Sequence, residues 1–201
     1  MKKRLMIIGA GGHGKVCAEI AELNGYESVS FLDDSDSKEN IVFGKTEEFT
    51  RFIEDYDFFV ALGDNRLRKS FLTRIADANG SVATLIHPNS TVSAKATVGA
   101  GSVVMAGAVI NPSTVVGKGA IINTASSLDH DNVLKDYVHI GVGAHLAGTV
   151  HIGEGTFIGA GATIINNVTV CEDSIVGAGA TVIKDIREKG TYIGTPARKI
   201  K

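Results

Sequence analysis

The sequence predicts two differently built domains, an α/β domain followed by a parallel β-helix of repeated coils. Three observations carry this prediction. Apolar runs alternate with helical periodicity over residues 1–80, an aliphatic residue recurs every six positions from residue 86 to residue 182, and the composition changes between the two regions. Nine of the twelve aromatic residues precede residue 87, whereas sixteen of the 24 glycines lie from residue 99 onward. We therefore expect domains over residues 1–82 and 83–201.

The overall composition excludes several classes of protein. A chain of 201 residues with 44% hydrophobic and 21% charged residues is not disordered and can bury a core. The formal net charge of -2 argues against general binding of nucleic acid. The two cysteines, Cys17 and Cys171, cannot form a disulfide framework. The basic start at residues 1–4 precedes an apolar run too short for a leader or a membrane span, so we expect a cytoplasmic protein.

Strands and helices alternate in the predicted N-terminal domain. Apolar runs predict strands at 5–8, 26–32 and 58–62, and helical spacing predicts helices at 15–23, 46–55 and 66–79. Thr46 is the expected N-cap of the second helix. This β-α-β-α-β-α order indicates a small parallel sheet with helices on both faces.

A glycine-rich loop joins the first predicted strand to the first helix. Residues 9–14 read Gly-Ala-Gly-Gly-His-Gly, a G-x-G-x-x-G match that favours a phosphate through free backbone N–H groups at a helix N-terminus. Asp33 and Asp34 follow about 20 residues later, where a carboxylate can bind a ribose or base hydroxyl. The pattern predicts a Rossmann-like nucleotide site, and a turn needed only for packing is the alternative. A nicotinamide-dependent oxidoreductase is disfavoured, because residues 1–80 make only half a dinucleotide fold.

The second domain carries a repeat of six residues. Each of the seventeen positions is Ile, Leu or Val. They are Ile86, Val92, Val98, Val104, Ile110, Val116, Ile122, Leu128, Leu134, Ile140, Leu146, Ile152, Ile158, Ile164, Val170, Val176 and Val182. One inward aliphatic residue in six suits a short strand followed by a turn, and three such strands close a coil of eighteen residues. Stacked coils bond at a spacing of roughly 4.8 Å, and a period of six is incompatible with a helix.

These features together resemble one known family. The repeat, the loop at residues 9–14, the stretch Gly-Asp-Asn-Arg at 63–66 and the ending Gly-Thr-Pro-Ala-Arg at 194–198 are similar to those of bacterial nucleotide-sugar acetyltransferases. These enzymes N-acetylate a 4-amino-6-deoxy sugar and are relatives of the sialic-acid O-acetyltransferases. The resemblance implies a left-handed coil and a homotrimer, with acetyl-CoA in the groove between adjacent β-helices. It also implies that the N-terminal domain holds the nucleotide of the sugar.

The resemblance also implies roles for particular residues. His130, in Leu-Asp-His-Asp-Asn, corresponds to a general base, because a sugar amine must lose a proton to attack a thioester and imidazole titrates near neutrality. Asp131 is the expected support of His130, with Asp129 as a rival partner. The substrate is expected to contact Gly11, Gly12, His13, Asp33, Asp34, Asn65, Arg68 and Asn123. Acetyl-CoA is expected at His139, Gly148, Ala178 and Lys184, with a Gly148 backbone N–H for the oxyanion. The cations for its phosphates are expected from Arg198, Lys199 and Lys201 at the terminus or from Lys184.

Metal chemistry and the choice of substrate complete the expectations. His139, His145 and His151 are spaced by six and point from successive faces of the coil, so they cannot chelate one ion, and we expect no metal. A UDP-linked sugar is the favoured substrate. Sugars linked to dTDP or GDP, and sialic acid, are alternatives, because recognition of the nucleotide base depends on a few contacts near residues 33–36. Besides the oxidoreductase, a non-catalytic binding β-helix is an alternative, although positions 112, 130 and 148 do not repeat one polar residue.

Overall fold

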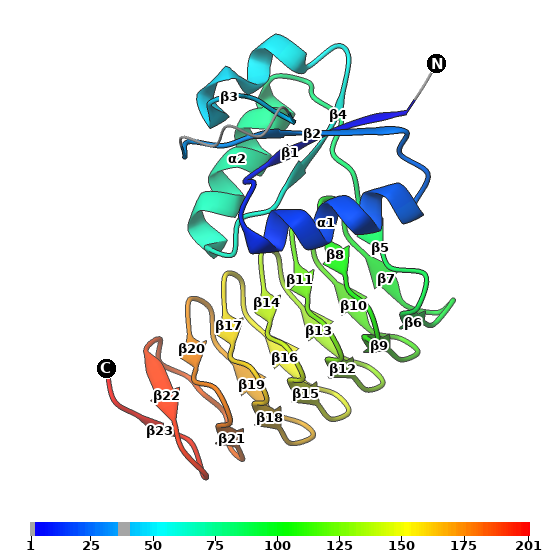
Figure 1. Cartoon of the computed structure of the whole chain (residues 1–201). Coiled ribbons are helices and arrows are strands. Elements are labelled where there is room, and N and C mark those ends of the chain that lie inside the picture. The colour runs from blue at the N-terminus through cyan, green and yellow to red at the C-terminus, as the bar shows by residue number, and fades with distance from the viewer. Residues whose placement is uncertain (1–2, 36–40) are drawn as a thin grey trace. The chain divides into compact units, whose positions relative to one another are not determined.

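The computed structural model describes residues 3–35 and 41–201 and divides into two compact units, Met1–Pro88 and Asn89–Lys201 (Figure 1). Met1 and Lys2 of the basic start, and Asp36 of the segment at 33–36, lie outside the described residues.

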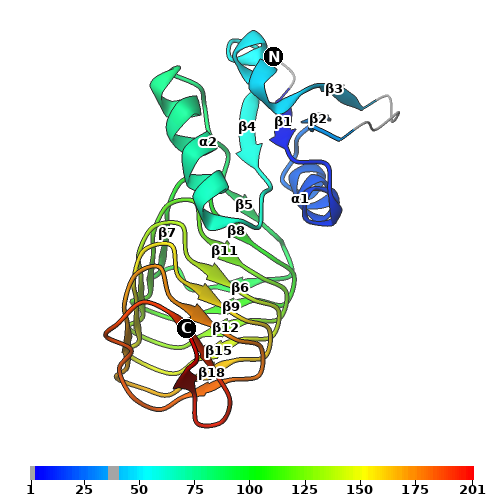
Figure 2. The same cartoon turned by 90° about the vertical axis from the view of Figure 1, so that its left-hand side faces the viewer.

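The first unit is built on a four-stranded parallel sheet in the order β3-β2-β1-β4. Its strands are β1 (Arg4–Ile8), β2 (Ser28–Leu32), β3 (Val42–Gly44) and β4 (Asp57–Val60), and its helices are α1 (Gly12–Leu23), the 3-10 helix η1 (Thr46–Phe52) and α2 (Asn65–Asp77). The last four residues of β1 are fully buried, as expected for a central strand covered on both faces. Figures 1 and 2 show α1 on one face of the sheet and η1 on the other.

The end of this unit is bonded to its first helix. The short strand β5 (Leu85–Ile86) closes the unit. The side-chain amide of Asn24 donates to the Ile86 carbonyl at 2.8 Å and accepts from its N–H at 3.0 Å. One amide therefore satisfies both backbone groups of Ile86.

The parallel sheet is as predicted, but three local predictions are wrong. Helix α1 begins at Gly12, inside the glycine loop, because the low helix propensity of glycine hides that first turn in the sequence. The predicted second helix is a 3-10 helix of seven residues, preceded by the unpredicted strand β3. Thr46 is not a cap: it is the first residue of η1, and its N–H donates to the Asp34 carboxylate at 3.0 Å.

The second unit is a left-handed parallel β-helix whose short strands form three faces (Figure 1). The first face consists of β7 (Thr97–Val98), β10 (Val115–Val116), β13 (Val133–Leu134), β16 (His151–Ile152) and β19 (Thr169–Val170). The second has β8 (Val103–Val104), β11 (Ile121–Ile122), β14 (His139–Ile140), β17 (Phe157–Ile158), β20 (Ile175–Val176), β22 (Thr191–Ile193) and the antiparallel β23 (Arg198–Lys199). The third has β6 (Thr91–Val92), β9 (Val109–Ile110), β12 (Ser127–Leu128), β15 (His145–Leu146), β18 (Thr163–Ile164) and β21 (Thr181–Val182). From β6 to β21 paired residues are eighteen apart, for example Ile122 and Ile140, which confirms the predicted coil.

The turns of successive coils stack into the edges of the β-helix, and two of these edges carry the predicted site residues. We call the turns at 93–96, 111–114, 129–132, 147–150, 165–168 and 183–186, which follow the third face, edge A. The turns at 105–108, 123–126, 141–144, 159–162 and 177–180, which follow the second face, form edge B. The third residue of many turns has a positive φ, such as Asp131 at 58° and Gly143 at 60°. Glycine adopts this conformation without strain, so the turns account for much of the glycine surplus.

Candidate active site

His130 projects from edge A on the turn between β12 and β13. Its side chain is 58% exposed, and its Nδ1 lies 2.7 Å from Asp131 Oδ2. With Nδ1–H donating to the carboxylate, Nε2 carries the lone pair and can accept a proton. The left-handed φ of Asp131 accompanies this contact between adjacent side chains. Of the two candidate partners, Asp131 contacts the ring.

Asp129 holds the backbone of the same turn. Its Oδ1 accepts from the His130 N–H at 2.9 Å and from Asn111 Nδ2, one coil earlier, also at 2.9 Å. These bonds, that of Asn111 first, lower the pKa of Asp129 below its ordinary value. The hydrogen bond to Asp131 and then the charge of Asp129 raise the pKa of His130 above its ordinary value. The sequence-based prediction did not include Asn111. Its position eighteen residues before Asp129 indicates that the two residues stack on successive coils.

Gly148 lies directly against the His130 ring. A Cβ at this position would be 2.6 Å from His130 Cε1 and 2.7 Å from Nε2, closer than atoms can approach. The 18-residue register stacks the two residues on successive coils, as the Thr149 N–H bond to the His130 carbonyl at 2.9 Å shows. Gly148 is buried, and because it has no side chain, the His130 ring can occupy the space beside it.

His130, Asp131 and Gly148 form one cluster on edge A, and a second cluster lies around edge B. Asn123 Nδ2 donates to His139 Nε2 at 3.3 Å, and the Phe157 ring packs edge-on against His139 with centroids 4.9 Å apart. Asn123 lies in the turn before β12 and His130 in the turn after it, so one face of the prism separates the two clusters within the chain. The structure therefore does not bring Asn123 and His139 together with His130 in one chain.

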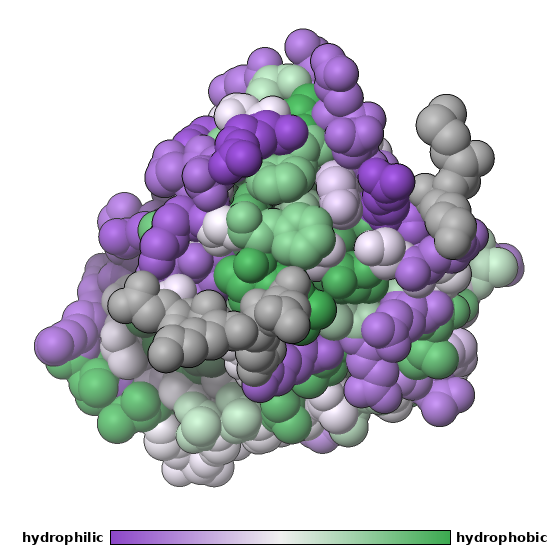
Figure 3. All heavy atoms as spheres, turned by 45° about the horizontal axis from the view of Figure 1, so that its top comes forward, coloured by the Kyte–Doolittle hydropathy of each residue, from purple (hydrophilic) through white to green (hydrophobic). Residues whose placement is uncertain are grey.

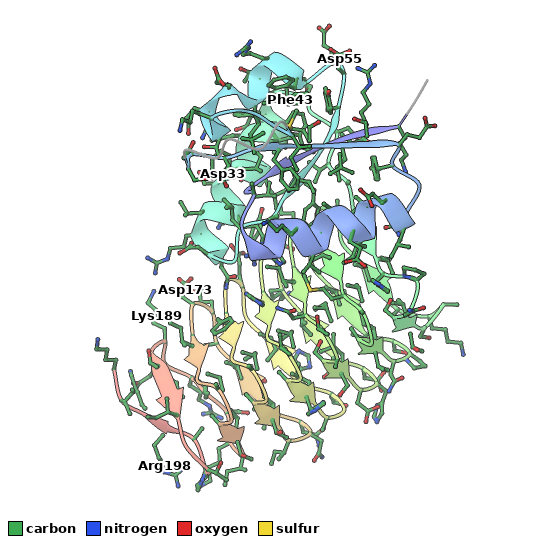
Figure 4. All side chains as sticks on the ribbon, viewed as in Figure 1. Asp33, Phe43, Asp55, Asp173, Lys189 and Arg198 are labelled. Carbon is green, nitrogen blue, oxygen red and sulfur yellow. The ribbon has the colours of Figure 1, made fainter. Side chains whose placement is uncertain are left out.

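The two remaining predicted acetyl-CoA residues lie about three coils beyond Asn123 and His130. Ala178 is exposed on edge B, and Lys184 is exposed on edge A. Lys184 lines a cavity of about 200 Å³ together with Arg198 and Lys199. Figure 4 labels Arg198 at this C-terminal end of the coil. The Asp185 carboxylate lines the cavity as well, so three cations and one carboxylate surround it, and the net positive charge suits a phosphate group.

The glycine loop of the first unit presents open backbone at the N-terminus of α1. A Cβ at Gly11 or Gly12 would meet no atom within 4 Å, so the space above both residues is open. A Cβ on Gly14 would instead lie 2.0 Å from the Gly9 carbonyl oxygen, so this glycine serves close packing. The first turn of α1 has no acidic residue, which leaves its positive dipole end available to an anion.

Asp33 lies beside this loop at the carboxyl end of β2 (Figure 4), and Asp34 follows it in the chain. Asp33 accepts from the Ala10 N–H at 2.6 Å and from the Ser35 hydroxyl. The Ser35 hydroxyl first, and then the Ala10 N–H, lower the pKa of Asp33. Asp34 binds the Thr46 hydroxyl at 2.9 Å. Both carboxylates therefore order loops at the carboxyl edge of the sheet.

The half-buried His13 of the loop lies near the buried Cys17 and Arg68. Arg68 is 1% exposed and donates to the Leu62 carbonyl at 2.9 Å and to Asn65 Oδ1 at 2.7 Å. Burial lowers the pKa of Arg68 to about 10, so its charge persists at neutral pH. Burial, and then the charge of Arg68, lower the pKa of His13 to about 4. Burial raises the pKa of Cys17 to about 12, so its thiol is not a nucleophile at neutral pH.

Hydrophobic side chains gather on the face of this unit that Figure 3 brings forward. Ile41 and Phe43 are 46% and 48% exposed, and the rings of Phe43 and Phe52 lie 6.3 Å apart. Ile41 also borders a cavity of about 440 Å³. Its lining comprises Ala10, Lys15, Ala18, Glu19, Glu22, Val29, Phe31 and Ile41. The cavity adjoins the glycine loop through Ala10.

Neither a metal cluster nor a membrane-spanning helix is found in the described parts of the chain. Within residues 3–35 and 41–201, no three His, Cys, Asp or Glu side chains are placed to hold one metal ion. His139, His145 and His151 lie on three different faces, on β14, β15 and β16. Among the helices in the same two ranges, none has both the length and the apolar character needed to cross a membrane.

The two units match two known protein families. Residues 4–75 match the family described as the PglD N-terminal domain, and residues 133–166 and 149–184 match the bacterial transferase hexapeptide family of six repeats. The fold and the repeat match thus define a hexapeptide-repeat transferase. The chain belongs to the hexapeptide-repeat acetyltransferases that carry a PglD N-terminal domain.

Two solved structures resemble the whole chain. The acetyltransferase domain of PglB from Neisseria gonorrhoeae FA1090, in complex with acetyl coenzyme A, is 41% identical with a TM-score of 0.94, and the match covers 100% of both chains. PerB from Caulobacter crescentus, in complex with CoA and GDP-perosamine, is 36% identical with a TM-score of 0.94, over 100% of this chain and 99% of that one.

One curated relative is a UDP-N-acetylbacillosamine N-acetyltransferase from Bacillus subtilis (strain 168). It is 38% identical over an alignment of 109 residues, and the match covers 49% of this chain and 50% of that protein. The match therefore spans about half the length of the relative.

Proposed function

We propose that this protein is an acetyl-CoA-dependent N-acetyltransferase that acetylates the C4 amine of a nucleotide-linked 4-amino-6-deoxy sugar, preferably a UDP sugar. The observation that carries the proposal is the exposed His130 ring, whose Nδ1 lies 2.7 Å from Asp131. The acetyl-CoA complex of the PglB domain and the GDP-perosamine complex of PerB support the two substrates. The Bacillus subtilis relative supports the choice of UDP.

His130 acts as the general base in this proposal. Nε2 takes a proton from the sugar amine as the amine nitrogen attacks the thioester carbonyl. The new C–N bond forms, the C–S bond breaks, and CoA leaves as the thiol after the proton returns to its sulfur. Asp131 stabilises the imidazolium, and the Gly148 backbone N–H stabilises the oxyanion.

The nucleotide belongs to residues 1–82 in this proposal, and the acetyl transfer belongs to residues 83–201. Gly11 and Gly12 give a diphosphate open backbone, and the α1 N-terminus and the buried Arg68 supply positive potential. His13 is neutral near pH 7, because its pKa is about 4, so it contributes hydrogen bonding and no charge. Asn65, Asp33 and Asp34 complete the expected substrate contacts.

The acetyl donor is proposed to bind along the β-helix between two subunits of a homotrimer. Asn123 and His139 form one wall at edge B, and His130 of a neighbouring subunit faces them. Ala178 would line the same groove, and the cavity with Lys184, Arg198 and Lys199 would take a phosphate of CoA. The separation of the two clusters within one chain supports this arrangement.

The reaction is tested by release of CoA thiol with a panel of UDP, dTDP and GDP 4-amino sugars together with sialic acid. We expect turnover with a 4-amino sugar and the highest kcat/KM with UDP. The His130→Ala variant should lose about 10²–10⁴-fold in kcat, the range of general-base catalysis.

The matched control is His145→Ala, because His145 is an exposed histidine of the third face bonded to Ser127 at 2.8 Å. It should turn over like the wild type. If no panel member releases CoA thiol, the function is wrong. Activity on sialic acid alone would identify an O-acetyltransferase instead.

A further inference from the structure

Asn111 and Asp129 make a side-chain bond between two successive turns of edge A. The amide of Asn111 donates to Asp129 Oδ1, and the same oxygen accepts the N–H of His130, each at 2.9 Å. The Asp129 carbonyl accepts from Thr114 Oγ1 at 2.8 Å and from the buried Asn132 Nδ2 at 2.6 Å. The residue that precedes the histidine is therefore held through both its side chain and its backbone.

The β-helix does not need this pair in order to close its turns. The corresponding positions on the other coils of edge A hold Ser93, Ala147, Ile165 and Ile183. Each of these turns joins the same two faces without an amide or a carboxylate at that position. The pair occurs where His130 is the next residue, so it serves the histidine and not the coil.

We propose that Asn111 and Asp129 are positioning residues for the acetyl transfer, which fix the turn so that the His130 ring lies over Gly148 with Asp131 at its Nδ1. The inference rests on the proposed function, because it assigns the catalytic base to His130. Asn111 holds the Asp129 carboxylate in place, and the carboxylate holds the His130 backbone. The ring is then restricted to the space that Gly148 leaves.

Few charged groups surround the ring. Asp129 and Asp131 flank it on its own turn, and the adjacent turns at 111–114 and 147–150 contain no titratable side chain. Removing the charge of Asp129 therefore removes one of two nearby negative charges that favour the imidazolium. Different substitutions can therefore test the charge of Asp129 and the geometry of the turn separately.

The test compares the full-length wild type with Asn111→Ala, Asp129→Asn and the control Ser93→Ala. Ser93 occupies the same position one coil before Asn111, and its hydroxyl accepts from the Lys95 N–H at 3.1 Å. Steady-state rates over a pH range give kcat and KM with acetyl-CoA and a sugar that the wild type acetylates. NMR titration of the His130 imidazole in the ligand-free protein is a second readout, independent of activity.

Asn111→Ala should lower kcat about tenfold and change both KM values less than twofold, since a displaced base loses rate and not binding. Asp129→Asn keeps an oxygen acceptor, so it should retain most of the plateau rate. Because a lower His130 pKa leaves the base unprotonated at lower pH, its acid limb and NMR midpoint should move to lower pH. Ser93→Ala should match the wild type in every readout.

Wild-type kcat and an unmoved His130 midpoint in both Asn111→Ala and Asp129→Asn would overturn the positioning role. A wild type that acetylates no amino sugar would instead refute the proposed function. The NMR titration would still decide whether the pair acts on His130, because it needs no turnover.

Discussion

At the scale of single residues, neighbours decide what each histidine can do. His130 is exposed between two carboxylates, and its pKa is raised. His13 is covered and lies near the buried Arg68, and its pKa falls to about 4. The sequence predicted His130 as the base and His13 as a substrate contact, but it does not show burial, so it did not reveal that their two pKa values shift in opposite directions. The choice between Asp129 and Asp131 likewise depended on turn geometry that the sequence left open.

Gly148 offers a test of the ring position with a single methyl group. Gly148→Ala places a Cβ 2.6 Å from His130 Cε1, and the φ of Gly148 lies outside the left-handed region, so the backbone tolerates alanine. The ring must move, and we expect kcat to fall about 100-fold, as for a base displaced by about 1 Å. The measurement is steady-state kinetics beside a thermal melt. Wild-type kcat with an unchanged melting temperature would show that the ring position does not matter.

At the scale of elements, the repeat was predictable because an aliphatic residue every six positions fits a short strand followed by a turn and does not fit a helix. All strands from β6 to β21 end on a predicted aliphatic position. The short elements of the first unit were harder to predict. Strand β3 has three residues and η1 seven, and each depends on a partner outside its own segment. Strand β3 pairs with β2 through Phe31 and Val42, and Thr46 of η1 bonds to Asp34.

The glycine loop combines two kinds of glycine, and Gly12 distinguishes binding from packing. Its Cβ would enter open space in the first turn of α1, where alanine is the better helix former. We expect Gly12→Ala to keep or raise the melting temperature by a few degrees, while the KM for the nucleotide sugar rises about tenfold because the methyl group occupies the approach to the backbone. The KM for acetyl-CoA serves as the internal control and should not change. A sugar KM like that of the wild type would mean that the phosphates bind elsewhere.

At the scale of the whole molecule, the predicted site residues of the β-helix fall on two edges. His130 and Gly148 lie on edge A, and Asn123 lies on edge B with His139 beside it. The sequence named the residues, and the eighteen-residue register fixed how they stack. Neither edge contains all of these predicted site residues. Residue types alone do not reveal this division, because it depends on the order of the strands around the prism. The proposed function uses all of them and therefore requires His130 of one subunit to face Asn123 and His139 of another.

This requirement predicts complementation between two inactive variants. His130→Ala and His139→Ala each destroy one wall of a site in the proposed trimer. Chains co-expressed in equal amounts with different tags should assemble at random, so about one interface in four pairs an intact His130 with an intact His139. Every trimer that contains both variants has one such interface among its three. We therefore expect doubly tagged trimers, with a mass near three times 21.0 kDa by light scattering, to recover about a third of wild-type activity. The two variants purified separately and mixed without subunit exchange provide the control. A monomeric mass, or mixed trimers no more active than either parent, would mean that one chain forms the complete site.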